Sequence, residues 1–432
     1  MKNLERLATQ LIELDDRIIA CMKCGLCQAV CPTFGSTMME ADVARGKLAL
    51  VDNLSHRLIE DPEAVADKLG RCLLCGSCQA NCPSGVSIID IFLEAREIVY
   101  AYIGLHPLKK IIFRQLLAKP LLFNLSMRVG APLQPVLFRP IKNKQKTSRA
   151  PLLDKVIGQR YIRTLAKKPL HVTQGAINTN AGKSNLKVAF FPGCLGDKMY
   201  TEMSEACLKV LNHHGVGIYM PKGMACCGIP AITSGDIDGM LAQTKVNLAK
   251  LAKEDFDYLV TPCASCTSTI KELWPRYAAR MSPSERSLIA EICPKTMDIN
   301  AFLVNILGLK ISESKAEQTT KITYHDPCHL KKSLGVSAEP RIVAQLNKKY
   351  ELVEMNEADR CCGCGGSFNL FHYDLSTNIG QRKRQNVVDS QAEIVVTGCP
   401  ACMMQLEDML SQNKDNVQVK HCVELYAASL PD

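Results

Sequence analysis

The second half of the chain alternates between short apolar runs and longer amphipathic stretches. Four of the apolar runs have the β-branched and aromatic composition of buried strands. They lie at residues 188–191, 258–260, 322–324 and 394–396. Helical patterns follow the first two runs, at residues 203–211 and 267–274. Because strands that alternate with helices indicate a parallel sheet, we expect an α/β fold in this region.

The N-terminal part of the chain has a different pattern. Between residues 38 and 70, apolar side chains recur at helical intervals and show no strand-like alternation. We therefore expect an α-helical domain that precedes the α/β region.

The composition adds two facts that need a cause, 22 cysteines in 432 residues and a formal net charge of +9. A hydrophobic content of 47% is enough for the cores of roughly two to four domains, which excludes a disordered chain. Charged residues at 15–17 stand where a signal peptide would be apolar, and the longest stretch without charged residues, 72–89, is broken by Gly, Pro and Asn. We therefore expect a cytoplasmic chain without a membrane span, whose thiols are metal ligands or redox groups.

The first eight cysteines form two copies of the motif C-x2-C-x2-C-x3-C-P, which start 51 residues apart. This spacing is typical of ferredoxins with two [4Fe-4S] clusters, because three thiolates on one tight loop reach three corners of a cubane and the fourth ligates the other cluster. Structural zinc sites use separated pairs of cysteines instead. The spacing predicts one cubane held by Cys21, Cys24, Cys27 and Cys82, and a second held by Cys72, Cys75, Cys78 and Cys31.

Ten of the remaining cysteines form a second duplication, in which each copy has a lone Cys, then Cys-Cys-Gly, then C-x-x-C. The first copy is Cys194, Cys226, Cys227, Cys263 and Cys266, and the second is Cys328, Cys361, Cys362, Cys399 and Cys402. The lone Cys and the C-x-x-C follow predicted strands. Since parallel sheets gather ligands at the carboxyl ends of their strands, the five thiols of each copy should converge. Adjacent thiolates project differently and fit poorly onto one cubane, so we expect a less symmetric cluster.

These motifs resemble the CCG cysteine-rich domain family, as they stand in GMACCGIPAITSGD with TPCASCTST, in DRCCGCGGSFNL with TGCPACMMQ, and in YHDPCHL. The family includes the B-type and D-type components of heterodisulfide reductase and the iron–sulfur subunits of glycolate oxidase, D-lactate dehydrogenase and anaerobic glycerol-3-phosphate dehydrogenase. The resemblance implies an α-helical ferredoxin domain followed by a duplicated α/β cysteine-rich domain pair, with one or two noncubane [4Fe-4S] clusters in that pair. We expect the ferredoxin domain at residues 1–104, a basic amphipathic connector at 105–185, and the two CCG domains at 186–310 and 320–432.

The resemblance implies an iron–sulfur electron-transfer subunit of a flavin-dependent 2-hydroxy-acid dehydrogenase that acts on glycolate or D-lactate. No G-x-G-x-x-G opens a helix after a strand in this sequence, so we expect FAD on a partner dehydrogenase subunit. A quinone or another membrane carrier would accept the electrons. Two alternatives stay open: a heterodisulfide reductase-like subunit that reduces a disulfide at a noncubane cluster, and the equivalent subunit of an anaerobic glycerol-3-phosphate dehydrogenase. From the cysteines alone, an inert zinc scaffold is a third.

Four cysteines fall outside the motifs. We interpret Cys207, Cys293 and Cys422 as small buried hydrophobic residues, whereas Cys364, beside the second Cys-Cys-Gly, could instead be a spare ligand or a proton donor.

Four histidines lie near the motifs or between predicted elements and could carry protons at neutral pH, although a hydrogen bond within a crowded loop is the simpler interpretation. They are His213, His214, His325 and His329.

The positive charge comes from one segment. Residues 105–170 contain fifteen Lys or Arg and a single acidic residue, Asp154, among blocks of Leu, Ile, Phe and Pro. Such a basic amphipathic segment suits an anionic membrane surface or an acidic partner, and a solvated linker fits equally well. We expect peripheral contact with the inner face of the cell membrane here. Nucleic acid is not expected, because no stacking platform or known reading module accompanies the charge.

Overall fold

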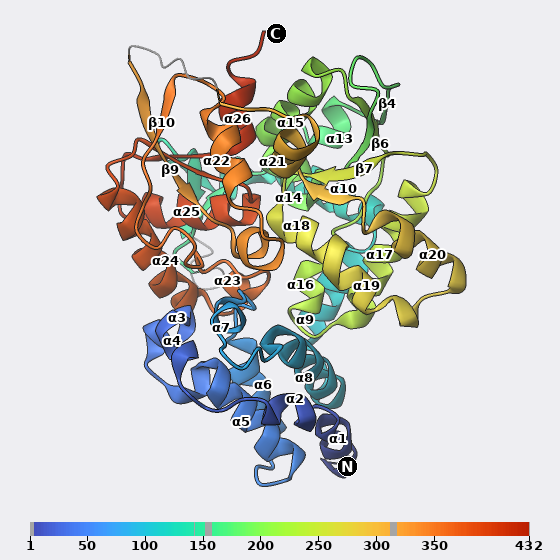
Figure 1. The fold of residues 1–432 in the computed structure, drawn as a ribbon, viewed down its shortest axis with the longest axis vertical. Helices are drawn as coiled ribbons and strands as arrows, with labels where there is room; N and C mark the ends of the chain where they lie inside the picture. Colours follow the sequence, from blue (N-terminus) through green and yellow to red (C-terminus); the bar gives the residue numbers. More distant parts are fainter. Residues whose placement is uncertain (1–3, 142, 152–157, 312–317, 432) are drawn as a thin grey trace.

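The computed structural model describes residues 4–141, 143–151, 158–311 and 318–431. A helical domain forms one end of the molecule, and two α/β units lie side by side at the other end (Figure 1). The elements of the helical domain are α1 (Leu4–Ile12), α2 (Asp15–Ile19), α3 (Leu26–Val30), α4 (Pro32–Thr37), η1 (Glu40–Asp42), α5 (Ala44–Ser55), α6 (Pro62–Gly70), α7 (Ser77–Ala80) and α8 (Ile88–Ile103).

The insert between the two ferredoxin motifs is helical, as its pattern predicts, and contains α5 and α6. Helix α6 begins at Pro62 because the Asp61 side chain accepts a hydrogen bond from the Ala64 amide, which caps the helix. Leu48 of α5 and Phe92 of α8 are both buried in the core of this domain. Lys47 of α5 and Phe92 of α8 lie beside the second cysteine loop.

The first α/β unit is built on a five-stranded sheet of order β4-β6-β5-β7-β8. Its strands are parallel except β4, which pairs antiparallel with β6. The elements are β4 (Ile177–Asn178), β5 (Lys187–Phe190), α14 (Gly193–Lys198), α15 (Thr201–His213), β6 (Gly217–Met220), α16 (Ile229–Ile232), α17 (Ile237–Leu251), β7 (Tyr258–Thr261), α18 (Ala264–Ser268), η5 (Thr269–Leu273), α19 (Trp274–Arg276), η6 (Ala278–Arg280), α20 (Pro283–Ile292), β8 (Thr296–Asp298), α21 (Ile299–Ala301) and η7 (Phe302–Ile306).

The second α/β unit has a four-stranded, fully parallel sheet of order β10-β9-β11-β12. Its elements are β9 (Thr320–His325), η8 (His329–Ser333), α22 (Ala338–Gln345), β10 (Tyr350–Leu352), α23 (Phe368–Phe371), α24 (Tyr373–Asp389), β11 (Ile394–Thr397), α25 (Pro400–Gln412), β12 (Gln418–His421) and α26 (Cys422–Ala427). When β4 is set aside, the two sheets have the same strand order. The duplication that the cysteine spacing predicts is therefore a duplication of the fold.

The two units share one core. Phe190 and Ile218 of the first sheet are buried in the same apolar cluster as Tyr324 of the second, and α15 packs against α26 across the boundary. His214 on this boundary hydrogen-bonds the hydroxyl of Tyr426 through Nε2 at 2.8 Å. The cysteine loops at the carboxyl ends of both sheets consequently keep a defined position relative to one another.

The basic connector contacts both α/β units. Its elements are α9 (Pro107–Lys110), η2 (Ile111–Leu116), α10 (Pro120–Gly130), η3 (Ala131–Leu133), α11 (Gln134–Leu137), β1 (Arg139–Pro140), β2 (Thr147–Arg149), β3 (Tyr161–Arg163) and α13 (Leu170–Thr173). Arg114 binds Asp236 of the first unit through two nitrogens, at 2.6 and 2.9 Å from Oδ1. Thr147 lies 2.8 Å from Ser411 of the second unit, measured between hydroxyl oxygens.

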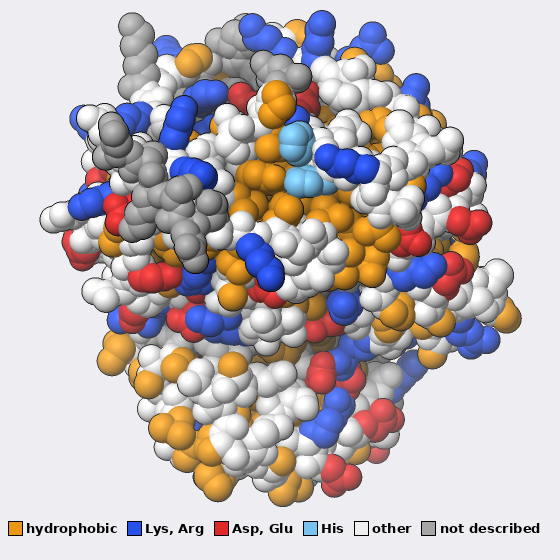
Figure 2. All heavy atoms as spheres, turned by 45° about the horizontal axis from the view of Figure 1, so that its top comes forward, with side chains coloured by type: hydrophobic (Ala, Val, Ile, Leu, Met, Phe, Trp, Pro, Cys, Tyr) orange, Lys and Arg blue, Asp and Glu red, His pale blue; other side chains and the backbone are white. Residues whose placement is uncertain are grey.

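The end of the molecule that carries the C-terminus shows hydrophobic side chains gathered around two histidines (Figure 2). Lysines and arginines are spread around this band rather than collected into one patch (Figure 2). In the described part of the chain, no helix is long and apolar enough to cross a membrane.

Candidate metal centres

The first ferredoxin cavity is lined by the four cysteines that the spacing groups together. Cys21, Cys24, Cys27 and Cys82 border a cavity of about 20 Å³. Cys24 is exposed to solvent, so this cavity lies at the surface of the helical domain.

The second ferredoxin cavity, also about 20 Å³, is lined by Cys31, Cys72, Cys75 and Cys78. Cys78 borders both cavities. The structure therefore brings the fourth cysteine of each motif to the first three of the other motif. Lys47 of α5, which the sequence did not single out, is 1% exposed in the wall of this cavity.

The two loops have left-handed residues at the same positions. Lys23 and Leu74 have φ of 57° and 52°, and Gly25 and Gly76 have φ of 86° and 73°, each pair in corresponding positions. Left-handed residues within such a loop turn successive amide groups toward a common centre and create a site for negative charge. A cluster held by four thiolates carries such charge.

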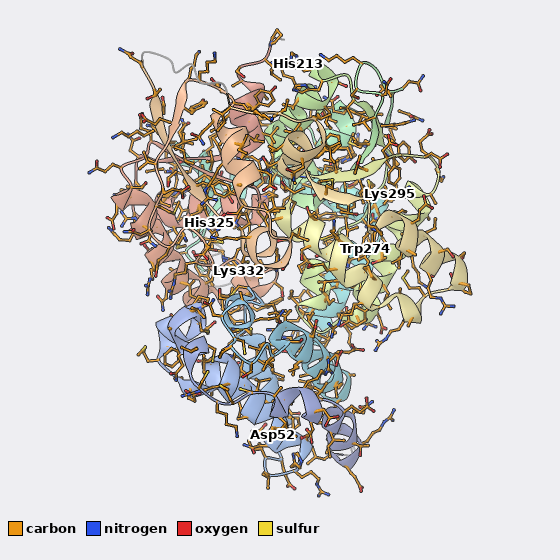
Figure 3. The ribbon with its side chains drawn as sticks, in the orientation of Figure 1. Asp52, His213, Trp274, Lys295, His325 and Lys332 are labelled. Atoms are coloured by element: carbon orange, nitrogen blue, oxygen red, sulfur yellow. The ribbon has the colours of Figure 1, made fainter. Side chains whose placement is uncertain are left out.

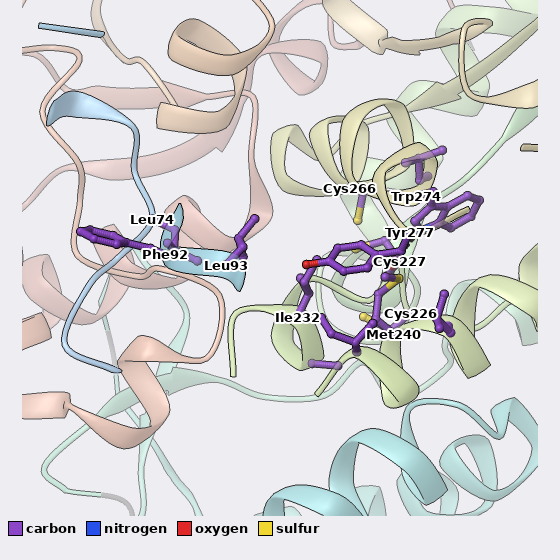
Figure 4. Packing of buried hydrophobic residues seen from close by; sticks show 14 of the residues in the cluster. Leu74, Phe92, Leu93, Cys226, Cys227, Ile232, Met240, Cys266, Trp274 and Tyr277 are labelled. Carbon is purple, nitrogen blue, oxygen red and sulfur yellow. Dashed lines mark hydrogen bonds between the residues drawn. The ribbon is translucent and has the colours of Figure 1, made fainter. Parts of the chain in front are cut away.

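In the first CCG repeat, all five cysteines converge at the carboxyl end of the sheet. Cys194 follows β5, and its sulfur lies 3.9 Å from that of Cys226. Cys227 accepts hydrogen bonds from the thiols of Cys226 and Cys266, which hold its pKa well below the usual value. Figure 4 shows Cys226, Cys227 and Cys266 in one packed region of the first unit, with Trp274 and Tyr277 beside them.

The glycine of Cys-Cys-Gly is required by the backbone in both repeats. Gly228 and Gly363 have φ of 106° and 97°. A Cβ on Gly228 would lie 2.6 Å from Cγ of Met240, and one on Gly363 would lie 2.7 Å from the Ser376 carbonyl oxygen. The turn that follows the paired thiols is therefore open only to glycine.

The second repeat repeats this geometry. A hydrogen bond with Cys361 and burial raise the pKa of Cys328, while the thiols of Cys361 and Cys402 lower the pKa of Cys362 by donating to it. Crowded buried thiols of this kind cannot all carry charge unless cations lie among them. The donor set thus fits a metal cluster.

A histidine lies beside the thiols of the second CCG repeat. The ligand atoms of His325, Cys362 and Cys402 are within 4.8 Å of one another. Nδ1 of His325 lies 3.2 Å from the Ala358 carbonyl oxygen, which agrees with the expected hydrogen bond, but its buried Nε2 has no partner among the described residues. Figure 3 shows His325 inside the second unit.

The four thiol groups form a series. Cys75 of the second ferredoxin cavity hydrogen-bonds Cys361, which raises the pKa of Cys75 together with burial. Cys263 of the first repeat donates to Cys399 of the second, lowering the pKa of Cys399. Since Cys78 borders both ferredoxin cavities, the groups form one series from the ferredoxin domain to the second repeat and from there to the first.

Further side chains join the loops at these junctions. Nδ1 of His329 lies 3.0 Å from the Ser265 hydroxyl, and that hydroxyl lies 3.7 Å from the sulfur of Cys399. Lys332 donates to the Ser77 hydroxyl at 2.6 Å and lies near the border with the ferredoxin domain (Figure 3).

The cysteines outside the motifs separate into two kinds. Cys207, Cys293 and Cys422 are at most 1% exposed and lie in apolar surroundings, which agrees with their interpretation as core residues. Cys364 is also buried, but charges on Cys362 and Cys399 contribute, after burial, to raising its pKa, so it borders the second repeat's thiols.

Comparison with known proteins agrees with this geometry. A 4Fe-4S dicluster domain model matches residues 17–86, and a cysteine-rich domain model, CCG, matches residues 188–271 and 322–407. The chain belongs to the CCG cysteine-rich domain family. It is accordingly an iron–sulfur protein with a helical ferredoxin domain and two CCG domains, as the sequence predicts.

The relatives of this CCG protein include subunits of oxidoreductases. It is 29% identical to the probable glycolate oxidase iron-sulfur subunit of Bacillus subtilis, over 91% of this chain and 89% of that one. It is 31% identical to lactate utilization protein A of Bacillus velezensis, over 56% and 98%. It is 30% identical to a subunit of the fumarate reductase (CoM/CoB) of Methanothermobacter marburgensis, over 61% and 50%.

A solved structure of a hypothetical protein from Helicobacter pylori shares the fold. The match has a TM-score of 0.52 at 10% sequence identity and covers 90% of this chain and 68% of that chain.

Proposed function

We propose that this CCG protein is the iron–sulfur electron-transfer subunit of a flavin-dependent 2-hydroxy-acid dehydrogenase, with glycolate or D-lactate as the substrate of its partner. The observation that carries the proposal is the continuous series of thiol groups from the exposed Cys24 to the half-buried Cys194. Electrons move only between centres that lie close together, and a series of touching ligand groups supplies such a route. The glycolate oxidase and lactate utilization relatives support the substrate class.

The ligands follow from the grouping of the thiols. We assign one cubane cluster to Cys21, Cys24, Cys27 and Cys82, and the other to Cys31, Cys72, Cys75 and Cys78. The two sets of five CCG cysteines are assigned to noncubane clusters, because adjacent thiols such as Cys226 and Cys227 suit an asymmetric cluster. When bound, these clusters supply one-electron transfer.

The chain's own residues position and insulate the centres. Helices α5 and α8 line the second ferredoxin cavity, and the glycine turns orient the buried paired CCG thiols. His329 joins the loops of three domains through Ser265 and the Leu74 carbonyl. The hydride-accepting step requires a flavin, which we place on a partner dehydrogenase subunit.

Anaerobic purification of the chain together with its partner proteins tests the proposal. The complex should contain a flavoprotein that oxidises D-lactate or glycolate, and this chain should hold about sixteen irons if four clusters are present. Cys226→Ser should lower the iron content and slow electron delivery from the flavoprotein. The matched control is Cys207→Ser, since Cys207 is equally buried but lies outside the thiol groups. Equal iron content in the two variants would refute the ligand assignment, and a colourless zinc protein would refute the function.

A disulfide reductase is the second candidate. Both CCG domains keep all five cysteines, and a subunit of the fumarate reductase (CoM/CoB) is among the relatives. Reduction of a thiol heterodisulfide by the isolated chain, lost in Cys361→Ser, would favour this candidate over electron transfer alone.

We further propose that residues 105–170 make peripheral contact with an anionic membrane surface, which would bring the chain close to a membrane electron carrier. Support comes from α10, a helix with no buried residue in which Leu121 is 85% exposed, on the same helix face as the basic Arg128. Sedimentation of the protein with vesicles that contain phosphatidylglycerol, and its release by salt, would test this contact.

A further inference from the structure

A groove of about 770 Å³ lies between α10 and residues 165–172 of the connector. Helix α10 contributes Leu121, Asn124, Leu125 and Arg128, which recur at intervals of three and four and therefore share one face. The lining is mostly apolar, and it is wide enough for a ligand of drug-like size or larger.

The inner end of the groove is polar. Lys198, which is 4% exposed, donates to Oδ1 of Asn124 at 2.6 Å, and its Nζ lies 3.2 Å from Nδ1 of His171. Nδ1 of His171 also lies 2.9 Å from Oδ1 of Asp197, and the other oxygen of this carboxylate pairs with Nζ of Lys198. These bonds hold one edge of the imidazole ring, so the ring can present Nε2 to a ligand.

This polar end separates the groove from the first CCG centre. Asn124, His171 and Lys198 line both the groove and a smaller cavity of about 40 Å³, whose walls also contain Cys194 and Cys226. Cys194 is the half-buried cysteine of its repeat, whereas the other four are buried. A ligand whose polar head rests on these three residues would lie next to the ligand set that ends the series of thiol groups.

The outer end of the groove is both apolar and basic. Leu121, Leu125 and Val172 are 85%, 59% and 60% exposed, and Lys167 and Lys168 stand on the same rim. Exposed leucines beside cations are suited to the headgroup level of an anionic lipid surface. The groove thus joins a surface of this kind to a redox centre.

We propose that this groove binds an isoprenoid quinone. Its apolar tail occupies the face of α10, and a carbonyl oxygen of its ring accepts a hydrogen bond at the polar end from Nε2 of His171, because the Lys198 ammonium already contacts Asn124, Asp197 and His171. A fatty acyl chain would fit the apolar walls equally well, but its position beside the cysteines of a redox centre would serve no purpose. The proposal rests on the proposed electron-transfer function, for which it names the acceptor class and its site.

The proposal is tested by measuring the Kd of oxidised menaquinone-4 for the iron-loaded chain in the absence of an electron donor. Leu125→Glu should raise the Kd at least about tenfold, because a carboxylate replaces an apolar contact in the groove. Leu108→Glu is the matched control, since Leu108 is 54% exposed on the same connector and lies outside the groove. An equal Kd in both variants would overturn the proposal.

Two further measurements identify the site and the recognised group. A photoreactive short-chain quinone should label peptides that contain α10 or residues 165–172, and labelling confined to other peptides would overturn the assignment. Geranylgeraniol, which offers an isoprenoid tail without the quinone ring, should compete poorly. If geranylgeraniol competed as strongly as menaquinone-4, the polar end would not recognise the quinone ring, and the proposal would be overturned. Since these experiments involve no electron transfer, quinone binding without electron delivery from the flavoprotein would count against the proposed function alone.

Discussion

Lys47 is a buried cation beside the second ferredoxin cavity, and its removal should have a large effect. Its Nζ lies 3.9 Å from Oδ1 of Asp42, and the two side chains are 1% and 0% exposed. Neither Nζ nor either Asp42 oxygen has a hydrogen-bond partner among the described residues. With an effective dielectric constant of about 20, two unit charges at this distance attract each other by about 4 kcal/mol. Burial lowers the pKa of Lys47, and the thiols of Cys72 and Cys31 oppose this shift.

Lys47→Met keeps much of the side-chain volume but leaves the Asp42 carboxylate unpaired. We expect the free energy of unfolding of the iron-loaded protein to fall by about 3 to 5 kcal/mol, measured anaerobically by urea unfolding. Adding Asp42→Asn should restore at least half of the loss, since no unpaired buried charge remains. A Lys47→Met protein as stable as the unsubstituted chain, or a double variant no more stable than the single one, would refute the reasoning.

The same substitution should change the redox behaviour of the site. A cation near the thiolates stabilises the more negative, reduced form, so Lys47→Met should lower the potential of the cluster assigned there. An anaerobic titration followed by electron paramagnetic resonance measures this shift. Arg57→Met, which removes an exposed cation of the same domain, should leave the potential unchanged.

Two other predictions concern contacts away from the cysteines. Burial raises the pKa of Glu407 to about 7, so the folded protein keeps a proton that the unfolded chain releases near pH 4.5. The contribution of this proton to stability is complete below pH 4.5 and is lost as the pH rises through 7. Relative to Glu407→Gln, the free energy of unfolding of the unsubstituted protein, measured by urea unfolding, should fall by about 2 to 3 kcal/mol between pH 5 and 8. Parallel plots of unfolding free energy against pH for the two proteins would contradict this prediction. Arg114→Leu should leave the fully buried Asp236 carboxylate without its bidentate partner and speed limited proteolysis of the connector. The exposed control Lys110→Leu should be cleaved at the original rate, and equal rates in the two variants would show that the Arg114–Asp236 pair does not hold the connector in place.

The structure explains why some residues were found from the sequence and others were not. The spacing of the ferredoxin motifs is a local property, since Cys21, Cys24 and Cys27 lie on one loop whose conformation needs only a few residues. Lys47 gave no comparable signal, because a lysine within a helix is ordinarily solvated. Its burial depends on how α5 packs against the cysteine loops.

The sequence by itself determined the composition of each thiol group, the strands that end at cysteines and the duplication of the α/β unit. These features follow from covalent spacing and from the period of apolar residues, both of which act over short stretches of chain. Only the tertiary structure decided which groups touch, as between Cys75 and Cys361 and between Cys263 and Cys399. It also placed His171 and Lys198 between an apolar groove and Cys194. Contacts between residues far apart in the sequence depend on the packing of whole domains, which no local pattern specifies.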